Sequence, residues 1–184
     1  WSSDVCSSDL LFTPPQPGEG VVVAPGIAGG ANWSPSAWDP SLQLFYVGAL
    51  HLPTRYIAHR VTRPDGSVLE YASTQNTGEA WGTLTALDLA NGGRLAWQVR
   101  TPEPLVGGVL VTAGGLVFSG AGKGRFAAFD ASSGQELWSY QAEAGVNAPP
   151  ISYAVGGRQY VAVAAGGNAL FGFTQGDAVV AFAI

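Results

Sequence analysis

The chain has 184 residues, a size that suits one domain. Its formal net charge is −5 and its eight lysines and arginines are scattered, which disfavours a nucleic-acid-binding protein with a basic stripe. No apolar run approaches the roughly 18 residues of a membrane-spanning helix, so we predict no transmembrane segment. Charged residues make up 11% and glycines number 26. This composition favours short strands, frequent turns and sheets that are buried on both faces.

The first ten residues, WSSDVCSSDL, contain Ser-Ser-Asp twice and look like translated sequencing adaptor. We therefore interpret residues 1–11 as a non-native leader and assign residues 12–184 to the fold. The single cysteine, Cys6, lies in this leader and has no second cysteine for an internal disulfide.

The first structural unit begins with a strand–turn–strand pattern at residues 36–47, where Asp-Pro supplies the turn. A polar insertion follows at residues 51–80, with Arg-Pro-Asp-Gly at 63–66 as a turn. The unit closes with GTLTALDLANGGRLAW at residues 82–97.

Two further units repeat this order of hairpin and closing element. The second unit has a Gly-Gly hairpin at residues 109–118 and GRFAAFDASSGQELW at 124–138. The third has a Gly-Gly hairpin at 151–163, and its closing copy, residues 177–184, stops before any Asp or Trp. We predict the three units at about residues 33–97, 105–140 and 148–184.

The two complete copies place Trp97 and Trp138 41 positions apart, within the roughly 40–45 residues of a four-stranded propeller blade. The predicted fold class is therefore all-β, with about three four-stranded antiparallel β-propeller blades. A three-unit open β-sandwich is the alternative, and the regular tryptophan spacing disfavours it. A self-contained protein of three blades is also disfavoured, because natural propellers have at least four.

The Ala-x-Asp…Gly…Trp element resembles the tryptophan-docking motif of quinoprotein propellers. This resemblance implies that Trp97 and Trp138 lie between neighbouring blades, where an indole buries a large apolar area. Asp88 and Asp130 would accept hydrogen bonds from backbone donors in the tight turn before the last strand. The same motif also occurs in non-enzymatic propellers of the cell envelope.

Three further segments resemble PQQ-dependent alcohol dehydrogenases: residues 29–40 with Gly-Gly-Ala-Asn-Trp, residues 107–120 with Thr-Ala-Gly-Gly-Leu-Val-Phe, and residues 147–163. Together the matches cover most of residues 26–184. The resemblance implies that the chain is the C-terminal part of an eight-bladed propeller in this quinoprotein alcohol and glucose dehydrogenase family.

The same resemblance implies a parent enzyme that oxidises alcohols or sugars with pyrroloquinoline quinone (PQQ) beside a Ca²⁺ or lanthanide ion. Its partners would be a small-molecule alcohol or sugar substrate and a cytochrome or quinone electron acceptor, and its location would be periplasmic. The alternative function is a non-catalytic tryptophan-docking scaffold of the cell envelope.

The resemblance places the Asn-Trp pair beside the quinone, so Asn32 and Trp33 are the leading cofactor-binding candidates, and Asn147 near the quinone rim is a weaker one. An amide can donate to a quinone or carboxylate oxygen. The alternatives are a turn residue for Asn32 and a buried blade-edge aromatic for Trp33. Val106 stands where methanol-type members have a tryptophan, which argues against that subgroup.

We predict no catalytic residue and no metal ligand in this chain, because the family's catalytic Asp and metal-binding Glu and Asn belong to earlier blades. The isolated chain should therefore be inactive. His51 and His59 have no partner at metal-site spacing, and we interpret both as solvated loop residues.

Overall fold

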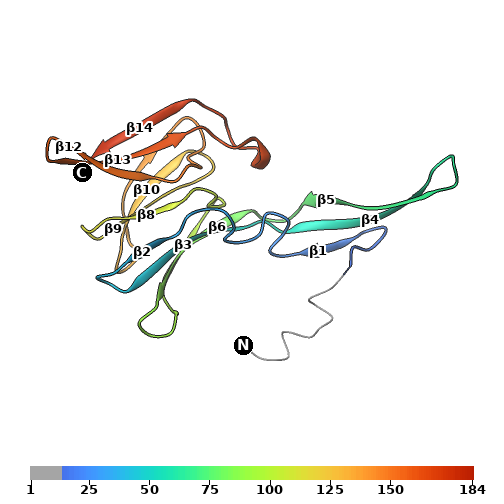
Figure 1. Ribbon diagram of the computed structural model, residues 1–184, viewed down its shortest axis with the longest axis horizontal. Coiled ribbons are helices and arrows are strands. Elements are labelled where there is room, and N and C mark those ends of the chain that lie inside the picture. The colour runs from blue at the N-terminus through green and yellow to red at the C-terminus, as the bar shows by residue number, and fades with distance from the viewer. Residues whose placement is uncertain (1–13) are drawn as a thin grey trace.

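The computed structural model describes residues 14–184, which are mostly strand (Figure 1). The predicted leader with Cys6 lies outside them. Within this range the one helical element is a 3-10 turn, η2 (Ala169–Phe171), and no helix is long and apolar enough to cross a membrane. The strands are β1 (Val21–Val23), β2 (Ala37–Asp39), β3 (Leu44–His51), β4 (Thr54–Thr62), β5 (Val68–Asn76), β6 (Trp81–Asp88), β7 (Arg94–Thr101), β8 (Val109–Val111), β9 (Leu116–Gly120), β10 (Arg125–Asp130), β11 (Glu136–Gln141), β12 (Ile151–Val155), β13 (Arg158–Ala165) and β14 (Ala178–Ala183).

The first sheet has the order β2-β3-β6-β7, with every neighbouring pair antiparallel. Buried and half-buried residues alternate along β3, because successive side chains of a strand point to opposite faces. In the β2–β3 turn, Oδ1 of Asp39 accepts hydrogen bonds from the backbone N–H groups of Ser41 and Leu42. The predicted Asp-Pro hairpin is therefore confirmed.

The insertion at residues 51–80 supplies β4 and β5, which together with β1 form a three-stranded sheet of order β1-β4-β5, called the arm here. Strands β4 and β5 pair over nine residues from Thr54↔Asn76 to Thr62↔Val68. The predicted turn at their tip is present, with Gly66 at φ 82°. The arm projects away from the other sheets (Figure 1).

The interpretation of both histidines as solvated loop residues was wrong. His51 is the last residue of β3 and His59 lies within β4. The His59 ring stacks on Tyr71, with ring centroids 4.8 Å apart, and its Nε2 lies 2.7 Å from Oγ of Ser73. Polarity was mistaken for loop character, although the β-branched and aromatic residues of this segment favour a strand.

The second sheet has the order β11-β10-β9-β8, and the third has the order β12-β13-β14. The two copies of the repeat share one irregularity. The register shifts between Ala86 and Leu87 where β6 pairs with β7, and between Ala128 and Phe129 where β10 pairs with β11. These positions correspond in the repeat, so the similarity in sequence reflects the same backbone path, including its bulge.

The central strands of the middle sheet, β9 and β10, are buried on both faces, whereas β11 is exposed along its length. On one side of β10, Ala127 and Phe129 join the core formed with the first sheet. On the other side, Phe126 and Ala128 join the core formed with the third sheet. Because both sets of alternating side chains are covered, β10 does not need the apolar–polar alternation of a half-exposed strand.

Trp97 joins the first and second sheets. Its side chain is 9% exposed, and its indole N–H donates a 2.9 Å hydrogen bond to the backbone carbonyl of Ala131. The ring lies against Gly134, where a Cβ atom would come within 2.5 Å of Trp97 Cε3. Trp138 contacts Phe182 of the third sheet edge-on and remains 39% exposed.

The turn aspartates have the predicted structural role. Oδ1 of Asp130 accepts hydrogen bonds from the backbone N–H and the hydroxyl of both Ser132 and Ser133. Asp88 accepts hydrogen bonds from the backbone N–H and the amide of Asn91. Separate antiparallel sheets joined by a docked tryptophan confirm the predicted propeller-blade class and exclude the open sandwich.

Candidate functional site

The candidate site is built from the loops that lead into the first strand of each sheet. The hydroxyl of Ser34 donates to the backbone carbonyl of Val106 at 2.8 Å. The backbone N–H of Val109 donates to the carbonyl of Pro35 at 2.9 Å. These two bonds hold the segment that follows Asn32 and Trp33 against the connection between β7 and β8.

The connection between β11 and β12 reaches loops of the second and third sheets through backbone hydrogen bonds. The N–H of Val146 donates to the carbonyl of Ala121 at 3.1 Å. The N–H of Gly167 donates to the carbonyl of Gly145 at 2.8 Å, and the N–H of Gly145 donates to the carbonyl of Thr174 at 3.0 Å. The connecting loops of all three sheets therefore lie at one end of the structure.

The glycine pair Gly107–Gly108 allows the loops to converge. A Cβ atom on Gly108 would lie 2.6 Å from Cγ of Pro35 and 2.8 Å from Cβ of Pro149. A Cβ atom on Gly107 would lie 3.3 Å from the carbonyl oxygen of Val146. The missing side chains thus let the Trp33 segment and the Asn147 segment pack on the same stretch of backbone.

Asn147 carries a buried amide without a partner. Neither its Nδ2 nor its Oδ1 has a hydrogen-bond partner in the part of the chain that the structure describes, although both atoms are buried. Its Nδ2 lies beside Gly145, at 2.6 Å from the position of an added Cβ. Leaving such a group unpaired costs about 1–3 kcal/mol, so a free donor and a free acceptor at converging loops indicate a place for a polar ligand.

Asn32 and Trp33 differ from Asn147 in their surroundings. Asn32 is exposed, and its Nδ2 donates to the carbonyl of Ala28 at 3.3 Å, which is the geometry of the alternative turn role. Trp33 is 55% exposed, so the alternative of a buried blade-edge aromatic was wrong. Its ring lies 6.4 Å from the ring of Phe171, with the planes tilted by 42°.

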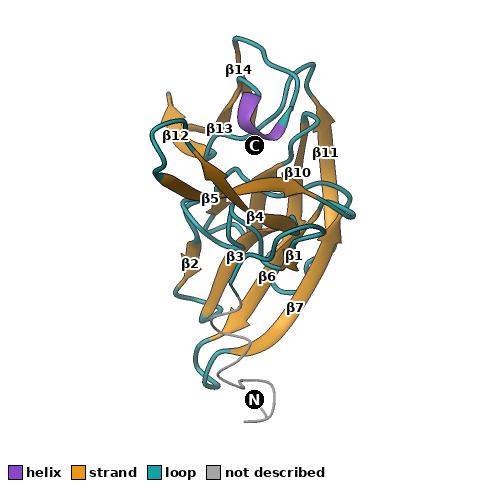
Figure 2. Cartoon of the chain, turned by 90° about the vertical axis from the view of Figure 1, so that its right-hand side faces the viewer, coloured by secondary structure: helices purple, strands orange, loops and turns teal. Residues whose placement is uncertain are grey.

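The loop between β13 and β14 supplies two aromatic residues that sequence reasoning missed. Phe171 and Phe173 stack with ring centroids 5.8 Å apart, and Figure 2 shows η2, which ends at Phe171, in purple near β13 and β14. A Cβ atom on Gly122 would lie within 2.3 Å of the Phe173 ring. The available signal was the apolar NALFGF segment inside a glycine-rich loop.

These phenylalanines connect the two sets of candidates. Both pack against a buried cluster that includes Leu50, Leu52 and Val106. Trp33 contacts Phe171, while Phe173 covers Gly122, whose carbonyl lies next to the Gly145–Asn147 stretch. The structure therefore links Trp33 and Asn147 through an aromatic pair, and Val106 lies below that pair at 3% exposure.

A stack of three side chains marks the start of the arm. The rings of His51 and Trp81 are parallel and 3.6 Å apart, and the guanidinium of Arg100 lies 4.2 Å from the Trp81 ring centroid. Burial, and then the positive charge of Arg100, hold the pKa of His51 below its ordinary value of 6.5. Among residues 14–184, no three His, Cys, Asp or Glu side chains gather as a candidate metal site.

Separate sheets, a docked tryptophan and loops that converge at one end define the class: a tryptophan-docking β-propeller domain. Residues 3–161 match the family model of the PQQ glucose/ethanol/alcohol dehydrogenase β-propeller domain. The chain belongs to this family.

Known proteins agree with this assignment in sequence and in fold. The chain is 39% identical over 159 residues to the quinoprotein ethanol dehydrogenase of Pseudomonas aeruginosa, which covers 83% of this chain and 25% of that protein. It matches the quinohemoprotein alcohol dehydrogenase from Comamonas testosteroni with a TM-score of 0.72 at 29% identity, over 93% of this chain and 28% of that one. A europium-containing methanol dehydrogenase gives a TM-score of 0.66 at 29% identity, over 85% and 29% of the two chains. The chain thus spans about a quarter of the length of its relatives.

Proposed function

We propose that the chain forms one wall of the PQQ site in a dehydrogenase that oxidises alcohols or sugars. The single observation that carries this proposal is the unpartnered, buried amide of Asn147 at the converging loops of a chain that belongs to the PQQ family. PQQ carries carboxylate and quinone oxygens, and an amide N–H₂ can donate to either kind. When bound, PQQ supplies the redox chemistry of the reaction.

The three candidate residues have separate roles in this proposal. Asn147 donates its Nδ2 hydrogens to a cofactor oxygen and thereby gains the partner that it lacks. Trp33 and Phe171 form an aromatic edge that contacts the planar cofactor and excludes water from it. Asn32 holds the turn that positions Trp33, and it reaches the cofactor only if it exchanges its bond to Ala28.

The proposal extends to the parent protein in the terms that its relatives suggest. The parent would use a Ca²⁺ or lanthanide ion, as the europium-containing relative indicates, with ligands that lie outside residues 14–184. Its electron acceptor would be a cytochrome or a quinone and its substrate a small alcohol or sugar, as the names of its relatives suggest. We further propose the periplasm as its location. The catalytic base is likewise proposed to lie outside this chain.

Two measurements on Asn147 test the cofactor role. We expect Asn147→Leu to weaken retention of PQQ by roughly tenfold in equilibrium dialysis, because a hydrogen bond to a charged group is lost. The same change should raise the free energy of unfolding without PQQ by about 1–3 kcal/mol, because it removes an unpaired buried amide. These opposite signs separate a ligand-binding residue from a structural one.

Asn91→Ala is the matched control, since Asn91 is an exposed amide in a turn and bonds Asp88. It should leave PQQ retention unchanged. If Asn147→Leu and Asn91→Ala retained PQQ equally well, the cofactor role of Asn147 would be excluded. If the unaltered chain, alone and with the rest of its dehydrogenase, retained no PQQ, the envelope-scaffold function would replace the present proposal.

A further inference from the structure

The turn between β6 and β7 contains an asparagine that is followed directly by two glycines. Asn91, Gly92 and Gly93 are all exposed. Both glycines have a φ of 76°, and apart from their chain neighbours no described atom lies within 4 Å of a Cβ added to either. The other asparagines of the chain are followed by Trp, Thr or Ala. Asn91 is therefore the one asparagine whose next residue has no side chain.

This neighbour leaves the side chain of Asn91 open to attack from within the backbone. A bond between the side-chain carbonyl carbon of an asparagine and the backbone nitrogen of the next residue closes a five-membered ring, which is favoured by proximity. A side chain on the next residue hinders this approach, and Gly92 has none. The N–H of Gly92 donates to the carbonyl of Leu89 at 3.4 Å, which is long for a hydrogen bond. The attacking nitrogen is therefore only weakly held.

Asp88 holds the Asn91 amide in the closed turn. Its Oδ2 accepts a 2.6 Å hydrogen bond from Nδ2 of Asn91, and its Oδ1 accepts one of 3.1 Å from the backbone N–H of the same residue. In the second sheet the hydroxyl of Ser133 donates to Asp130 at 2.8 Å, so a serine can make the same kind of bond. Exposed turns open locally at little cost in free energy, and such opening releases the Asn91 amide.

We propose that Asn91-Gly92 is a site of spontaneous deamidation. In the open turn the N–H proton of Gly92 is lost to solvent, the nitrogen bonds to Cγ of Asn91, and Nδ2 takes up a proton and leaves as ammonia. Water then opens the cyclic imide at either carbonyl, which leaves aspartate or isoaspartate at this position. The site is separate from the proposed PQQ wall and does not depend on it.

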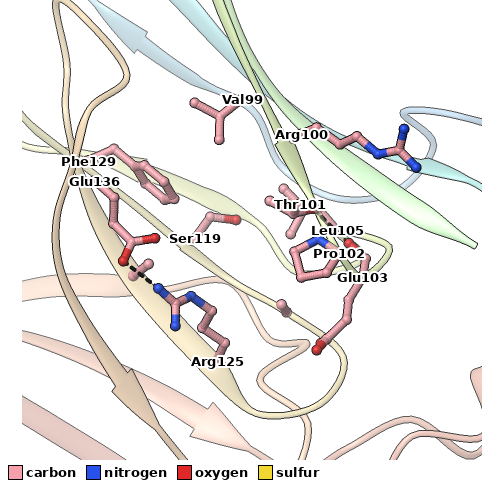
Figure 3. A pocket seen from close by; sticks show the side chains of 12 residues that line it. Val99, Arg100, Thr101, Pro102, Glu103, Leu105, Ser119, Arg125, Phe129 and Glu136 are labelled. Atoms are coloured by element: carbon pink, nitrogen blue, oxygen red, sulfur yellow. Dashed lines mark hydrogen bonds and ion pairs between the residues drawn. The ribbon is translucent and has the colours of Figure 1, made fainter.

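Either product disturbs the joint between the first two sheets. A new carboxylate replaces the amide donor beside Asp88 with a like charge. Isoaspartate also adds a methylene to the backbone of the turn that leads into β7, the strand of Trp97. Val99 and Thr101 of β7 line the pocket between these sheets (Figure 3). Ser119 of β9 lies on the same pocket, and its Oγ has no hydrogen-bond partner among the described residues. Deamidation should therefore loosen a joint that is already imperfectly packed.

Incubation of the full chain at mildly alkaline pH, followed by peptide mapping with mass spectrometry, tests this proposal. We expect the mass gain of an amide-to-acid change to accumulate at Asn91 before it appears at Asn76, an exposed asparagine that is followed by Thr. An isoaspartyl methyltransferase should label the product. The rate should rise in proportion to the hydroxide concentration, because the deprotonated nitrogen is the attacking group. Gly92→Ala should slow the conversion roughly tenfold, because the added Cβ hinders ring closure.

Three variants separate this chemistry from general instability of the turn. Gly92→Ala strains the turn, so a reaction limited only by opening would become faster in this variant. Asn91→Ser copies the serine of the second turn, and it should abolish conversion without a change in the urea midpoint. Asn91→Asp supplies one product directly and should unfold at a lower urea concentration than Asn91→Ser.

The outcomes that contradict the proposal are distinct. Conversion at Asn76 as fast as at Asn91, a rate that does not depend on pH, or faster conversion in Gly92→Ala would each overturn the assignment of the site. An Asn91→Asp chain as stable as the Asn91→Ser chain would overturn the effect on the joint.

Discussion

The indole N–H of Trp97 and the backbone carbonyl of Ala131, 34 residues apart, form a 2.9 Å hydrogen bond across the junction of the first two sheets. The hydroxyl of Tyr46 donates to the same carbonyl at 3.1 Å. Both lone pairs of one buried oxygen are thus used by side chains of the first sheet. This arrangement fixes the second sheet against the first with directional bonds as well as apolar contact.

Replacement of the two motif tryptophans should have unequal effects. Trp97→Ala should lower the free energy of unfolding by about 3–5 kcal/mol, because a large buried side chain is lost. Trp138→Ala should cost about 1–2 kcal/mol, because that ring is 39% exposed. Urea unfolding followed by circular dichroism measures both values. Equal losses would contradict the view that only Trp97 is fully docked in the described part.

The turn glycines offer a second matched pair. Gly134→Ala should cost about 2–4 kcal/mol, because the new methyl meets the Trp97 ring and the backbone has φ 73°. Gly92→Ala in the corresponding turn of the first sheet should cost about 1 kcal/mol, since φ is 76° but no described atom lies within 4 Å of the added Cβ. Differential scanning calorimetry of the two variants gives the comparison. A Gly92 variant as unstable as the Gly134 variant would refute the role of close packing.

Tyr46 should make the fold sensitive to alkali. Burial, followed by the charges of Asp39 and Asp130, raises the pKa of Tyr46 to about 12 from its ordinary value of 10.0. Because the folded pKa is the higher one, the contribution to stability is complete below pH 10 and is lost as the pH rises towards 12. Tyr46→Phe should flatten the dependence of the free energy of unfolding on pH between 10 and 12. An unchanged slope in Tyr46→Phe would show that another tyrosine or a lysine controls it.

His51 should make the stability of the fold sensitive to acid. Its lowered pKa means that the unfolded chain binds a proton more readily than the folded one below pH 6.5. Stability should therefore decrease as the pH falls from about 7 through 6.5 and below. His51→Phe keeps a ring against Trp81 and should remove this decrease. Tyr71→Phe, a change of the exposed tyrosine that stacks on His59, is the control and should leave the decrease in place. Stability curves measured from pH 7.5 to 5 decide between these outcomes.

The blades could be predicted from sequence because their constraints are local. Ala-x-Asp, a glycine turn and a tryptophan each determine a feature within a few residues: strand, hydrogen-bonded turn, and docked ring. The identical register shifts at Ala86 and Ala128 show that even the bulge is encoded in the repeat. The strands of the arm were missed because a hairpin rich in polar residues has the same composition as a loop. Whether such residues form a strand depends on pairing with a partner strand.

The site was less predictable than the fold. The sequence shows that Asn147 is an amide, but its lack of a partner depends on how the loops of all three sheets converge. The position of Phe171 over the Val106 cluster likewise results from contacts between distant segments. Ser119 resembles any strand serine until the neighbouring sheet leaves a gap beside it. These features arise from tertiary packing, for which a single sequence carries no local signal.

The joint at Trp97 has two unlike halves: one sheet presents a ring, and the next presents a glycine turn that receives it. Surfaces of this heterologous kind do not pair symmetrically, so blades follow one another head to tail, and they close into a ring only where the rotation between successive blades adds up to a full turn. Within residues 14–184, the turn at Gly92 and Gly93 has no ring against it, and Trp138 is partly exposed. The unlike halves of the Trp97 joint therefore determine the order in which the first two blades follow one another.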